Sequence, residues 1–97
     1  MYILEVLSGP LDGKSWSFER EITIGRDDAV ASACITLDRY ISRKHARLSE
    51  EGDRLVLADL ASRNGTLVDG RPATAATELV PGERFIVGRT LLRVKRA

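Results

Sequence analysis

The apolar residues of this chain occur in runs of three to seven residues, and residues typical of tight turns separate these runs every few positions. The turn sequences are Asp12-Gly13, Glu51-Gly52-Asp53, Asp69-Gly70, Pro81-Gly82 and Gly88. Glycine readily adopts the positive φ of a tight turn, and proline fixes φ at a value that other turn positions need. Short runs joined by such turns predict hairpins of β-strands, and no stretch of the chain predicts a long helix.

We therefore predict an all-β fold, a single β-sandwich of about eleven short, mainly antiparallel strands that spans residues 1–97. The expected strands are 2–7, 15–19, 21–24, 34–37, 45–49, 54–59, 66–68, 71–72, 77–79, 84–87 and 90–94. Trp16 and Phe18 alternate with polar residues, as on a strand with one buried face. Leu91, Leu92 and Val94 break this alternation, which predicts a strand that is bulged or buried on both faces.

Three segments do not fit the strand pattern. The polar segments 27–33 and 38–44 are expected to be loops. Alanines at positions 73, 75 and 76 allow a brief helix, but prolines at positions 72 and 81 leave little room for one. The prediction therefore keeps strands and loops throughout the chain.

Composition restricts the classes of protein to which the chain can belong. Its 97 residues suffice for one domain, 43% of them are hydrophobic, and the formal net charge is only +1. So little net charge gives no general attraction for nucleic acid or for an anionic membrane, so any anion site must be local. No run approaches the roughly 18 apolar residues of a membrane helix. The apolar run 1–7 contains Glu5 and ends at Ser8-Gly9-Pro10, which indicates a strand instead of a leader peptide.

The single cysteine and the single histidine exclude two further kinds of site. Cys34 has no disulfide partner in the chain, and between Ala33 and Ile35 it is expected to be a small buried hydrophobe. One cysteine and one histidine do not make a zinc ligand set, so we predict neither a metal nor a cofactor. A reducing compartment is permitted, and the cytoplasm is the expected location.

Three loop motifs concentrate the residues that carry chemistry. They are Gly25-Arg26 after a strand, Ser42-Arg43-Lys44-His45-Ala46 entering a strand, and Ser62-Arg63-Asn64-Gly65-Thr66 between two strands. Loops at one end of a sandwich converge in space. Together the motifs supply guanidinium groups, hydroxyls, an ammonium and a carboxamide, which suit a phosphate dianion and an adjoining extended peptide.

The three motifs, in this order and spacing, resemble the signature of the forkhead-associated (FHA) domain family, and the resemblance spans the whole chain. Its most specific part is Ser-Arg-Lys-His-Ala, followed eighteen residues later by Asn-Gly-Thr. The resemblance implies a phosphothreonine-dependent protein interaction module without catalytic activity, most similar to bacterial members. Its partner would be a phosphothreonine-containing protein or peptide, such as a Ser/Thr kinase or its substrate. A stand-alone adaptor and a domain of a longer signalling or secretion-system protein both remain open.

The resemblance also assigns roles to individual residues. Arg26 and Ser42 match the phosphate-binding arginine and serine of the family, and Asn64 matches the asparagine that bonds the peptide main chain. Arg43 and Arg63 occupy positions of further phosphate or peptide contacts. Lys44, Arg39 and Tyr40 are expected at the periphery, where a solvated loop face is the alternative. Gly25, His45, Gly65 and Thr66 match the signature as residues that hold the loops in place.

Two other functions compete with this interpretation. Ser42, His45 and Asp59 are the residue types of a hydrolase triad, but a serine three residues before the histidine lacks the context of a nucleophile elbow. The chain is therefore not expected to be an enzyme. A phosphate-independent docking or scaffold domain that uses the same sandwich remains the open alternative. Nucleic-acid binding is not predicted, because few aromatic residues are available to stack on bases, and neither is membrane insertion.

Overall fold

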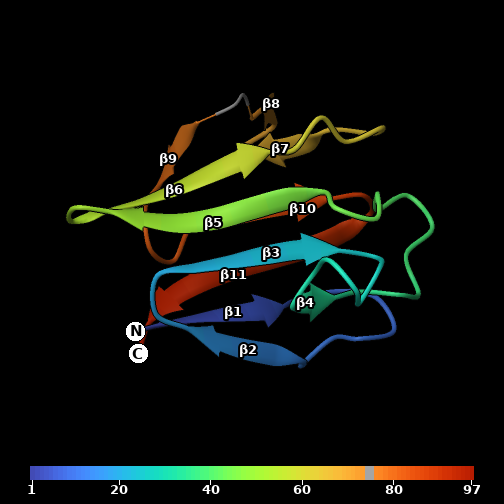
Figure 1. The fold of residues 1–97 in the computed structure, drawn as a ribbon, viewed down its shortest axis with the longest axis horizontal. Helices are drawn as coiled ribbons and strands as arrows, with labels where there is room; N and C mark the ends of the chain where they lie inside the picture. Colours follow the sequence, from blue (N-terminus) through green and yellow to red (C-terminus); the bar gives the residue numbers. More distant parts are fainter. Residues whose placement is uncertain (74–75) are drawn as a thin grey trace.

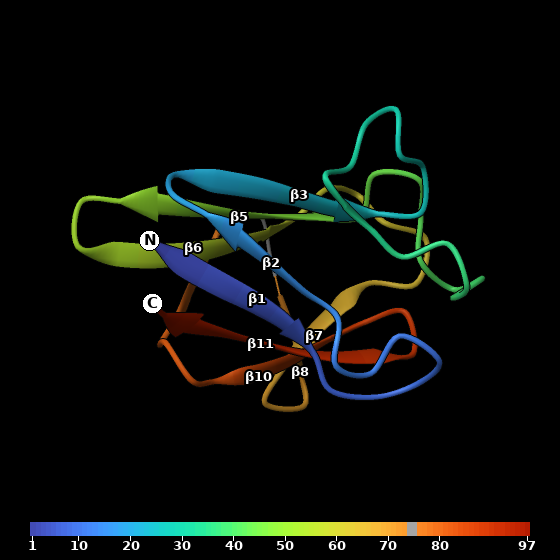
Figure 2. The same cartoon turned by 90° about the horizontal axis from the view of Figure 1, so that it is seen from below.

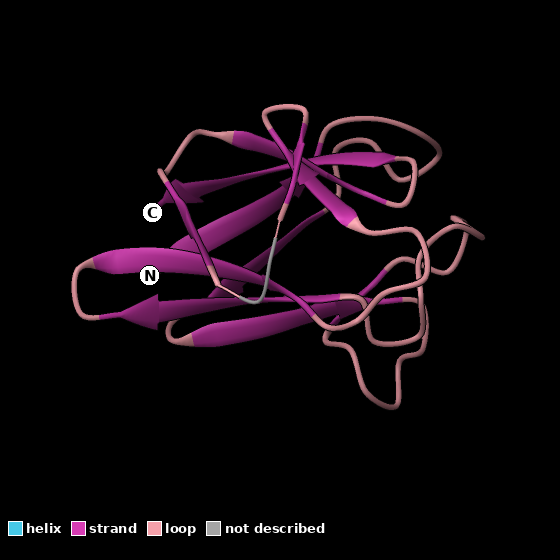
Figure 3. Ribbon diagram, turned by 90° about the horizontal axis from the view of Figure 1, so that it is seen from above, coloured by secondary structure: helices cyan, strands magenta, loops and turns pink. Residues whose placement is uncertain are grey.

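The chain folds into two β-sheets that pack face to face, as a computed structural model shows for residues 1–73 and 76–97 (Figure 1). The strands are β1 (Tyr2–Val6), β2 (Ser15–Phe18), β3 (Glu21–Gly25), β4 (Ala33–Cys34), β5 (Ala46–Glu51), β6 (Arg54–Asp59), β7 (Thr66–Val68), β8 (Arg71–Pro72), β9 (Thr77–Leu79), β10 (Arg84–Val87) and β11 (Thr90–Arg96). Strands and loops alone make up this part of the chain (Figure 3), where no helix has the length and apolar character needed to cross a membrane. The predicted all-β sandwich is confirmed.

The two sheets are built mainly from antiparallel neighbours. One has the strand order β2-β1-β11-β10-β7-β8, and the other has the order β4-β3-β5-β6-β9. Tight turns join the hairpins, as predicted. In the turn between β7 and β8, for example, Asp69 and Gly70 have φ angles of 53° and 78°, which are the positive values that a two-residue hairpin turn requires. The pair β3 and β4 is parallel.

The core lies between the sheets and is formed mainly by alternate residues of the strands, together with Ile35 and Ile41 from the loop between β4 and β5. The largest fully buried apolar side chains are Tyr2, Leu4, Ile24, Ile35, Ile41, Leu48, Leu55, Leu57, Leu79, Phe85 and Leu92. Strand β11 contributes Leu92 and Val94 to this core, whereas Leu91 is only half-buried on the opposite face. The prediction of a bulged or doubly buried strand was therefore wrong, because β11 keeps an unbroken register with β10 and simply has an apolar residue on its outer face.

The segment after β3 departs most from the prediction. The expected strand 34–37 is reduced to β4: the amide of Ile35 still donates to the carbonyl oxygen of Gly25 at 2.8 Å, but Leu37 is already 61% exposed. Cys34 is half-buried instead of fully buried, and its thiol donates a hydrogen bond to the carbonyl oxygen of Arg26 at 3.5 Å. Burial raises the pKa of this thiol, and Asp28 and Asp27 raise it further. Of the residues in the brief helical alternative, Ala75 lies outside the described part of the chain.

The two ends of the sandwich have different roles. The termini meet at one end, where the amide of Ala97 donates to the carbonyl oxygen of Met1 at 3.1 Å. The loops that follow β3, β4 and β6 gather at the opposite end (Figure 2). These loops contain the three motifs, as expected for loops at one end of a sandwich.

Candidate binding site

Three loops form the site: residues 26–32 between β3 and β4, residues 35–45 between β4 and β5, and residues 60–65 between β6 and β7. The first two are held together through their main chains. The amide of Arg26 donates to the carbonyl oxygen of Ser42 at 3.0 Å, and the amide of Asp27 donates to that of Arg43 at 3.3 Å. The third is joined to the second, because the amide of Leu60 donates to the carbonyl oxygen of His45 at 2.8 Å.

Gly25 makes the close approach of the first two loops possible. A Cβ atom on this residue would lie 2.0 Å from the carbonyl oxygen of Arg43, which is far inside the contact distance of two non-bonded atoms. Any larger residue would push the second loop away from β3. The glycine of the first motif is thus required by space, and its neighbour Arg26 is placed against the second loop as a result.

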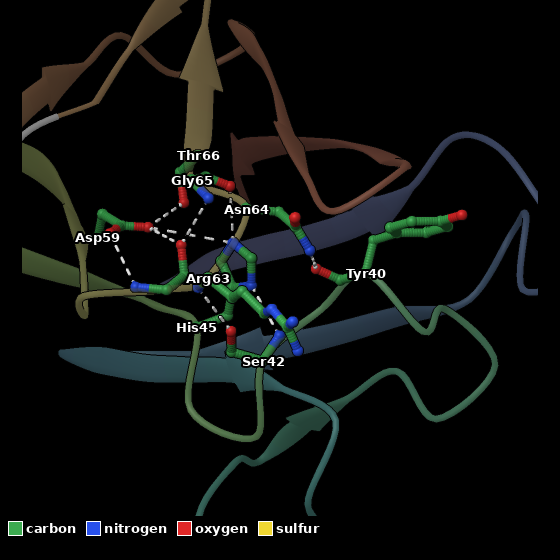
Figure 4. A network of polar contacts seen from close by, with 9 residues as sticks. Tyr40, Ser42, His45, Asp59, Arg63, Asn64, Gly65 and Thr66 are labelled. Atoms are coloured by element: carbon green, nitrogen blue, oxygen red, sulfur yellow. Dashed lines mark hydrogen bonds and ion pairs between the residues drawn. The ribbon is translucent and has the colours of Figure 1, made fainter.

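His45 connects the second loop to the third through hydrogen bonds of its side chain. Its side chain is completely buried. Its Nδ1 accepts a hydrogen bond from the amide of Ser42 at 2.9 Å, and its Nε2 lies 2.8 Å from the carbonyl oxygen of Gly65 (Figure 4). Because an amide can only donate, Nδ1 carries no proton, and in the neutral ring Nε2 is the donor to Gly65. Both ring nitrogens are therefore engaged by main chain, and the ring holds the two loops at a fixed separation.

Asp59, at the end of β6, organises the third loop. Its Oδ1 accepts hydrogen bonds from the hydroxyls of Ser62 at 2.5 Å and of Thr66 at 2.8 Å, and its Oδ2 accepts from the amide of Ser62 at 3.1 Å (Figure 4). The hydroxyl of Ser62 in turn accepts from the amide of Gly65 at 2.9 Å. Burial raises the pKa of the Asp59 carboxyl, but these hydrogen bonds and the nearby His45 lower it more, so the pKa lies below its ordinary value.

We call His45, Asp59, Ser62 and Thr66 the loop scaffold. The sequence analysis assigned His45 and Thr66 to a supporting role but missed the part that Asp59 and Ser62 play. The signal was present, since an aspartate followed three residues later by a serine is typical of a turn in which the carboxylate caps the following main chain. Asp59 was considered only as a member of a catalytic triad.

The geometry of that triad is not the geometry of a hydrolase. A nucleophilic serine needs a hydrogen bond between its hydroxyl and the base. Here the Nδ1 of His45 is bonded to the Ser42 amide, and the Ser42 Oγ accepts instead from the amide of Arg63 at 3.0 Å. The remaining nitrogen, Nε2, lies 4.0 Å from an Asp59 oxygen. This arrangement therefore provides no activated hydroxyl.

Above the loop scaffold lies a pocket of about 200 Å³, which we call the arginine pocket. Its lining residues are Arg26, Arg39, Tyr40, Ile41, Ser42, Arg43, Arg63 and Asn64. The structure thus brings together every predicted contact residue and two of the three peripheral ones, whereas Lys44 lies outside the pocket. Among the described residues, no carboxylate lines it. Within residues 1–73 and 76–97, none of its four guanidinium groups forms an ion pair with an acidic side chain.

Several residues that line this pocket keep hydrogen-bonding groups that the loops do not use. The Nε of Arg26 donates to the carbonyl oxygen of Ile41 at 3.0 Å, and the two terminal nitrogens have no protein partner among the described residues. Since the Ser42 Oγ accepts from Arg63, its own proton remains for another acceptor. Asn64 donates through Nδ2 to the carbonyl oxygen of Tyr40 at 2.8 Å, which leaves its side-chain oxygen available. Asn64 therefore both supports the second loop and offers an acceptor.

A second anchor, at Asp38, fixes the start of this loop, and the sequence analysis did not find it. The Asp38 carboxylate accepts from the amides of Tyr40 at 2.9 Å and Arg89 at 2.8 Å, and from the Thr90 hydroxyl at 2.7 Å. The turn before β11 comes so close that a Cβ atom on Gly88 would lie 2.7 Å from Ile41. The contact between these distant segments is tertiary, so no local pattern predicts it.

Comparison with known proteins places this arrangement in a family. Residues 5–97 match the family model described as the inner membrane component of T3SS, the type III secretion system, cytoplasmic domain. The chain is also 34% identical over 93 residues to the FHA domain-containing protein FhaB of Mycobacterium tuberculosis. The chain belongs to the FHA domain family. Within that family it is a member of the group that the secretion-system model describes. The alignment with FhaB covers 95% of this FHA domain but only 59% of FhaB.

Solved structures agree with the assignment. The FHA domain of the CT664 protein from Chlamydia trachomatis is 28% identical, with a TM-score of 0.88 over 99% of this chain and 97% of that one. Another FHA domain, from an analysis of phosphothreonine-dependent FHA-domain interactions, is 28% identical, with a TM-score of 0.84 over 99% of this chain and 96% of that one. FhaB and the CT664 protein are bacterial, which fits the expected similarity to bacterial members, and an FHA domain of Arabidopsis thaliana is 27% identical with a TM-score of 0.88 over 97% of this chain and 83% of that one. FHA domains are protein interaction modules, and this chain has their fold.

Proposed function

We propose that this FHA domain binds a phosphothreonine-containing segment of a partner protein in its arginine pocket, and that it does so without catalysing a reaction. The observation that carries the proposal is the arginine pocket itself, which is lined by Ser42 and by four arginines that have no acidic partner among the described residues. The FHA domain with phosphothreonine-dependent interactions, which shares this fold at 28% identity, supports the same assignment.

The binding mechanism follows from charge and geometry. A phosphothreonine carries close to two negative charges and three strong acceptor oxygens. Arg26 and Arg43 come from adjacent loops whose main chains are bonded to each other, so their backbones are held close together, and both residues line the pocket. Ser42 adds a short hydroxyl donor, and the free oxygen of Asn64 is suited to accept a main-chain amide of the bound peptide. An unphosphorylated threonine would offer these donors a single neutral hydroxyl.

The free energy of the phosphate contacts is large enough for phosphorylation to control binding. Each charge-assisted hydrogen bond contributes about 1.5 to 3 kcal/mol. Several such bonds form only after a kinase has added the phosphate, so phosphorylation should change affinity by orders of magnitude. We infer that the partner is a Ser/Thr kinase or one of its substrates, and that the domain acts in the cytoplasm, where such kinases use ATP.

The match to the secretion-system family model supports a second candidate, which is docking without phosphate. In such a role the sandwich would serve as a structural part of an assembly, and the four arginines would contact carboxylates or nothing at all. The two candidates differ in one property, the dependence of binding on the phosphate group.

The test is a titration of the domain with degenerate peptides that contain phosphothreonine, phosphoserine or unphosphorylated threonine. Binding is measured by the fluorescence anisotropy of the peptide. We expect binding of the phosphothreonine peptides only, and loss of that binding in Arg26→Ala. The matched control is Arg47→Ala, because Arg47 is exposed on β5 outside the arginine pocket and its removal changes the net charge equally. This control should retain the affinity of the unaltered domain.

Two outcomes would contradict the proposal. Equal binding of phosphorylated and unphosphorylated peptides would favour the phosphate-independent docking domain. An equal loss of affinity in Arg26→Ala and Arg47→Ala would mean that the phosphate is attracted only by general positive charge and not by this pocket. Circular dichroism of both variants would show that neither effect comes from unfolding.

A further inference from the structure

The outer face of the six-stranded sheet carries a row of apolar residues. Ile86 in β10 is the direct cross-strand partner of Leu91 in β11 and of Leu67 in β7. Pro72 in β8 is in turn the partner of Leu67. Leu7, one residue beyond β1, continues the row, because its amide donates to the carbonyl oxygen of Leu91 at 2.8 Å. Residues directly opposite each other lie on the same face of a sheet. We call these five residues the apolar row.

The apolar row is open to solvent. Ile86 and Leu67 are each 37% exposed, and Leu91 is half-buried. In β10 and β11 the residues that alternate with the row already fill the core. The row borders a groove of about 340 Å³ with a mainly apolar surface. Because apolar residues that adjoin one another on an exposed face are typical of an interaction surface, the row calls for a partner.

Beside the apolar row lies a row of charged residues of both signs. Arg93 in β11 is the direct partner of Glu5 in β1 and of Arg84 in β10. Glu5 forms an ion pair with Arg93, at 3.1 Å between Oε1 and Nη2. Within residues 1–73 and 76–97, neither Arg84 nor Asp69 forms an ion pair, and both line the groove. This face therefore has both a cation and an anion available to a partner.

The apolar row is symmetric about its middle residue, Ile86. A rotation of 180° about an axis in front of Ile86 and parallel to β10 places a second copy's row on this one in reverse order. Ile86 then faces the second copy's Ile86, and Leu91 faces the second copy's Leu67. In the charged row, the same rotation brings Asp69 opposite the second copy's Arg93. Each contact away from the axis occurs twice, because a two-fold interface is the same patch on both copies.

We propose that this face packs against the same face of a second copy of the chain, so that the domain forms a two-fold homodimer. Two sheets pack face to face about 10 Å apart with interdigitating side chains, and the two apolar rows would form such a layer. None of the five residues lines the arginine pocket. The dimer therefore goes beyond the proposed function and does not depend on it.

The charges favour a second copy over an anionic partner. A membrane surface or a nucleic acid would be repelled by Glu5 and Asp69, which lie beside the apolar row. A second copy instead supplies a cation for each anion. A helix of another protein would also cover the row, but in that case the domain would not associate with itself. Self-association is thus the property that decides.

The size of the face sets the expected strength of the dimer. Neighbouring strands lie about 4.8 Å apart, so the six-stranded sheet is about 24 Å wide. The seven residues of β11 extend over about 23 Å. A face of this size covers about 500 Å² on each copy, near the lower limit of specific interfaces. The approach of the two Arg84 side chains at the axis weakens the association further. We expect a dissociation constant between about 0.1 and 1 mM.

The experiment is sedimentation equilibrium of the chain between about 10 µM and 2 mM. We expect the average mass to rise towards that of a dimer. Ile86→Ser should weaken the association at least about tenfold, because each copy loses a buried aliphatic contact. The matched control is Val56→Ser, since Val56 is half-buried on the outer face of the other sheet. Leu67→Ser is the second variant if circular dichroism shows that Ile86→Ser is unfolded.

The charge contact has its own test. Asp69→Asn should weaken the dimer about threefold, as expected for an exposed ion pair that occurs twice. Asparagine also tolerates the positive φ of this turn. The control is Asp53→Asn, because Asp53 is exposed in the turn between β5 and β6. Equal effects of the two substitutions would remove Asp69 from the interface and overturn the arrangement.

Each other failure has its own result. A chain that stays monomeric at about 2 mM would overturn the proposal, as would association that survives Ile86→Ser or falls equally in Val56→Ser. Association that disappears in Arg26→Ala would belong to the arginine pocket. Binding to vesicles of anionic lipid that is lost in Ile86→Ser, without self-association, would assign the row to a membrane surface. Ile86→Ser should keep its phosphothreonine-peptide affinity, so the dimer and the proposed function fail or stand separately.

Discussion

The end of the sandwich that carries the three loops has two layers whose chemistry is opposite. In the lower layer, the loop scaffold, each polar group bonds another group of the protein, as His45 does with Ser42 and Gly65. In the upper layer, the arginine pocket, guanidinium groups such as those of Arg26 and Arg43 keep donors without a carboxylate partner among the described residues. The difference teaches that the scaffold groups hold the loops together, whereas the arginines keep donors that, under the proposed function, contact the ligand. Stability and binding should therefore respond to different substitutions.

His45→Ala tests the lower layer most severely. It leaves the amide of Ser42 and the carbonyl oxygen of Gly65 without partners in a partly buried place, where each such group costs about 1 to 3 kcal/mol. We expect the free energy of unfolding in urea to fall by about 3 kcal/mol or more. Peptide affinity should fall too, because the loops are no longer held together.

Tyr2→Phe is the matched control for this change. Tyr2 is as buried as His45, but it lies in β1 and its hydroxyl donates a single hydrogen bond to Glu50 at 2.8 Å. Its loss should cost about 1 kcal/mol and leave affinity unchanged. Full stability of His45→Ala would show that the scaffold is dispensable and would remove the distinction between the layers.

Gly25→Ala should affect both layers, because Gly25 lies where the first loop contacts the second. The added Cβ atom would lie 2.0 Å from the carbonyl oxygen of Arg43, so the second loop must shift. Overpacking of this kind costs about 1 to 3 kcal/mol, and the shift should also separate Arg26 from Ser42 and weaken phosphopeptide binding. Gly52→Ala is the control, because Gly52 has a φ of +65° with nothing within 4 Å of an added Cβ. It should lose about 1 kcal/mol of stability and no affinity.

Ser62 and Ser42 allow the two layers to be compared with the same substitution, serine to alanine. Ser62→Ala removes a donor to Asp59 and the acceptor for Gly65, so we expect a loss of about 1 to 2 kcal/mol of unfolding free energy. Ser42→Ala removes only an acceptor for the exposed amide of Arg63 and should cost less than about 1 kcal/mol of stability. Its affinity for a phosphothreonine peptide should nevertheless fall about tenfold, as measured by anisotropy. If Ser62→Ala and Ser42→Ala changed unfolding free energy equally and peptide affinity equally, the distinction between a stabilising and a binding layer would be contradicted.

Acid should loosen the loop scaffold. Because the pKa of Asp59 lies below its ordinary value in the folded state, its ionised form stabilises the fold above the unfolded pKa, near pH 3.9. That stability is lost as the pH falls through the lower, folded pKa. NMR measures this loss. We expect the amide resonances of Ser62 and Gly65 to titrate with a midpoint below about pH 3.9.

Glu5 provides the comparison for this titration. Burial raises the pKa of its carboxyl, but the hydrogen bond from Arg93 and the nearby Lys95 lower it more, so its pKa is also below the ordinary value. Glu5→Gln should therefore flatten the acid dependence of unfolding without altering the titration of Ser62 and Gly65. A midpoint at or above the ordinary carboxyl value would show that the hydrogen bonds to Asp59 do not favour its charge.

The sequence predicted the upper layer better than the lower one. Alternation and turn residues placed nearly every strand, and the resemblance named the residues that the structure gathers in the arginine pocket. The sequence-based predictions were wrong where tertiary contacts determine the structure. The parallel edge strand β4 and the partial exposure of Cys34 depend on how the chain leaves the sheet. Asp38 and Gly88 meet across fifty positions of sequence, and no local pattern records that contact.

The smallest effect concerns backbone strain in the third loop. Ala61 has a φ of 57°, in the left-handed region that costs a residue with a side chain about 1 to 2 kcal/mol. Ala61→Gly removes that strain but adds about 0.5 to 1 kcal/mol of unfolded-state entropy, so we expect a gain in unfolding free energy of about 0.5 kcal/mol. Asp69 has a similar φ of 53° in the turn after β7, and its side chain tolerates that conformation better. Asp69→Gly should therefore gain less. A loss of stability in Ala61→Gly would mean that the loop scaffold, and not the local backbone, determines the energy of this loop.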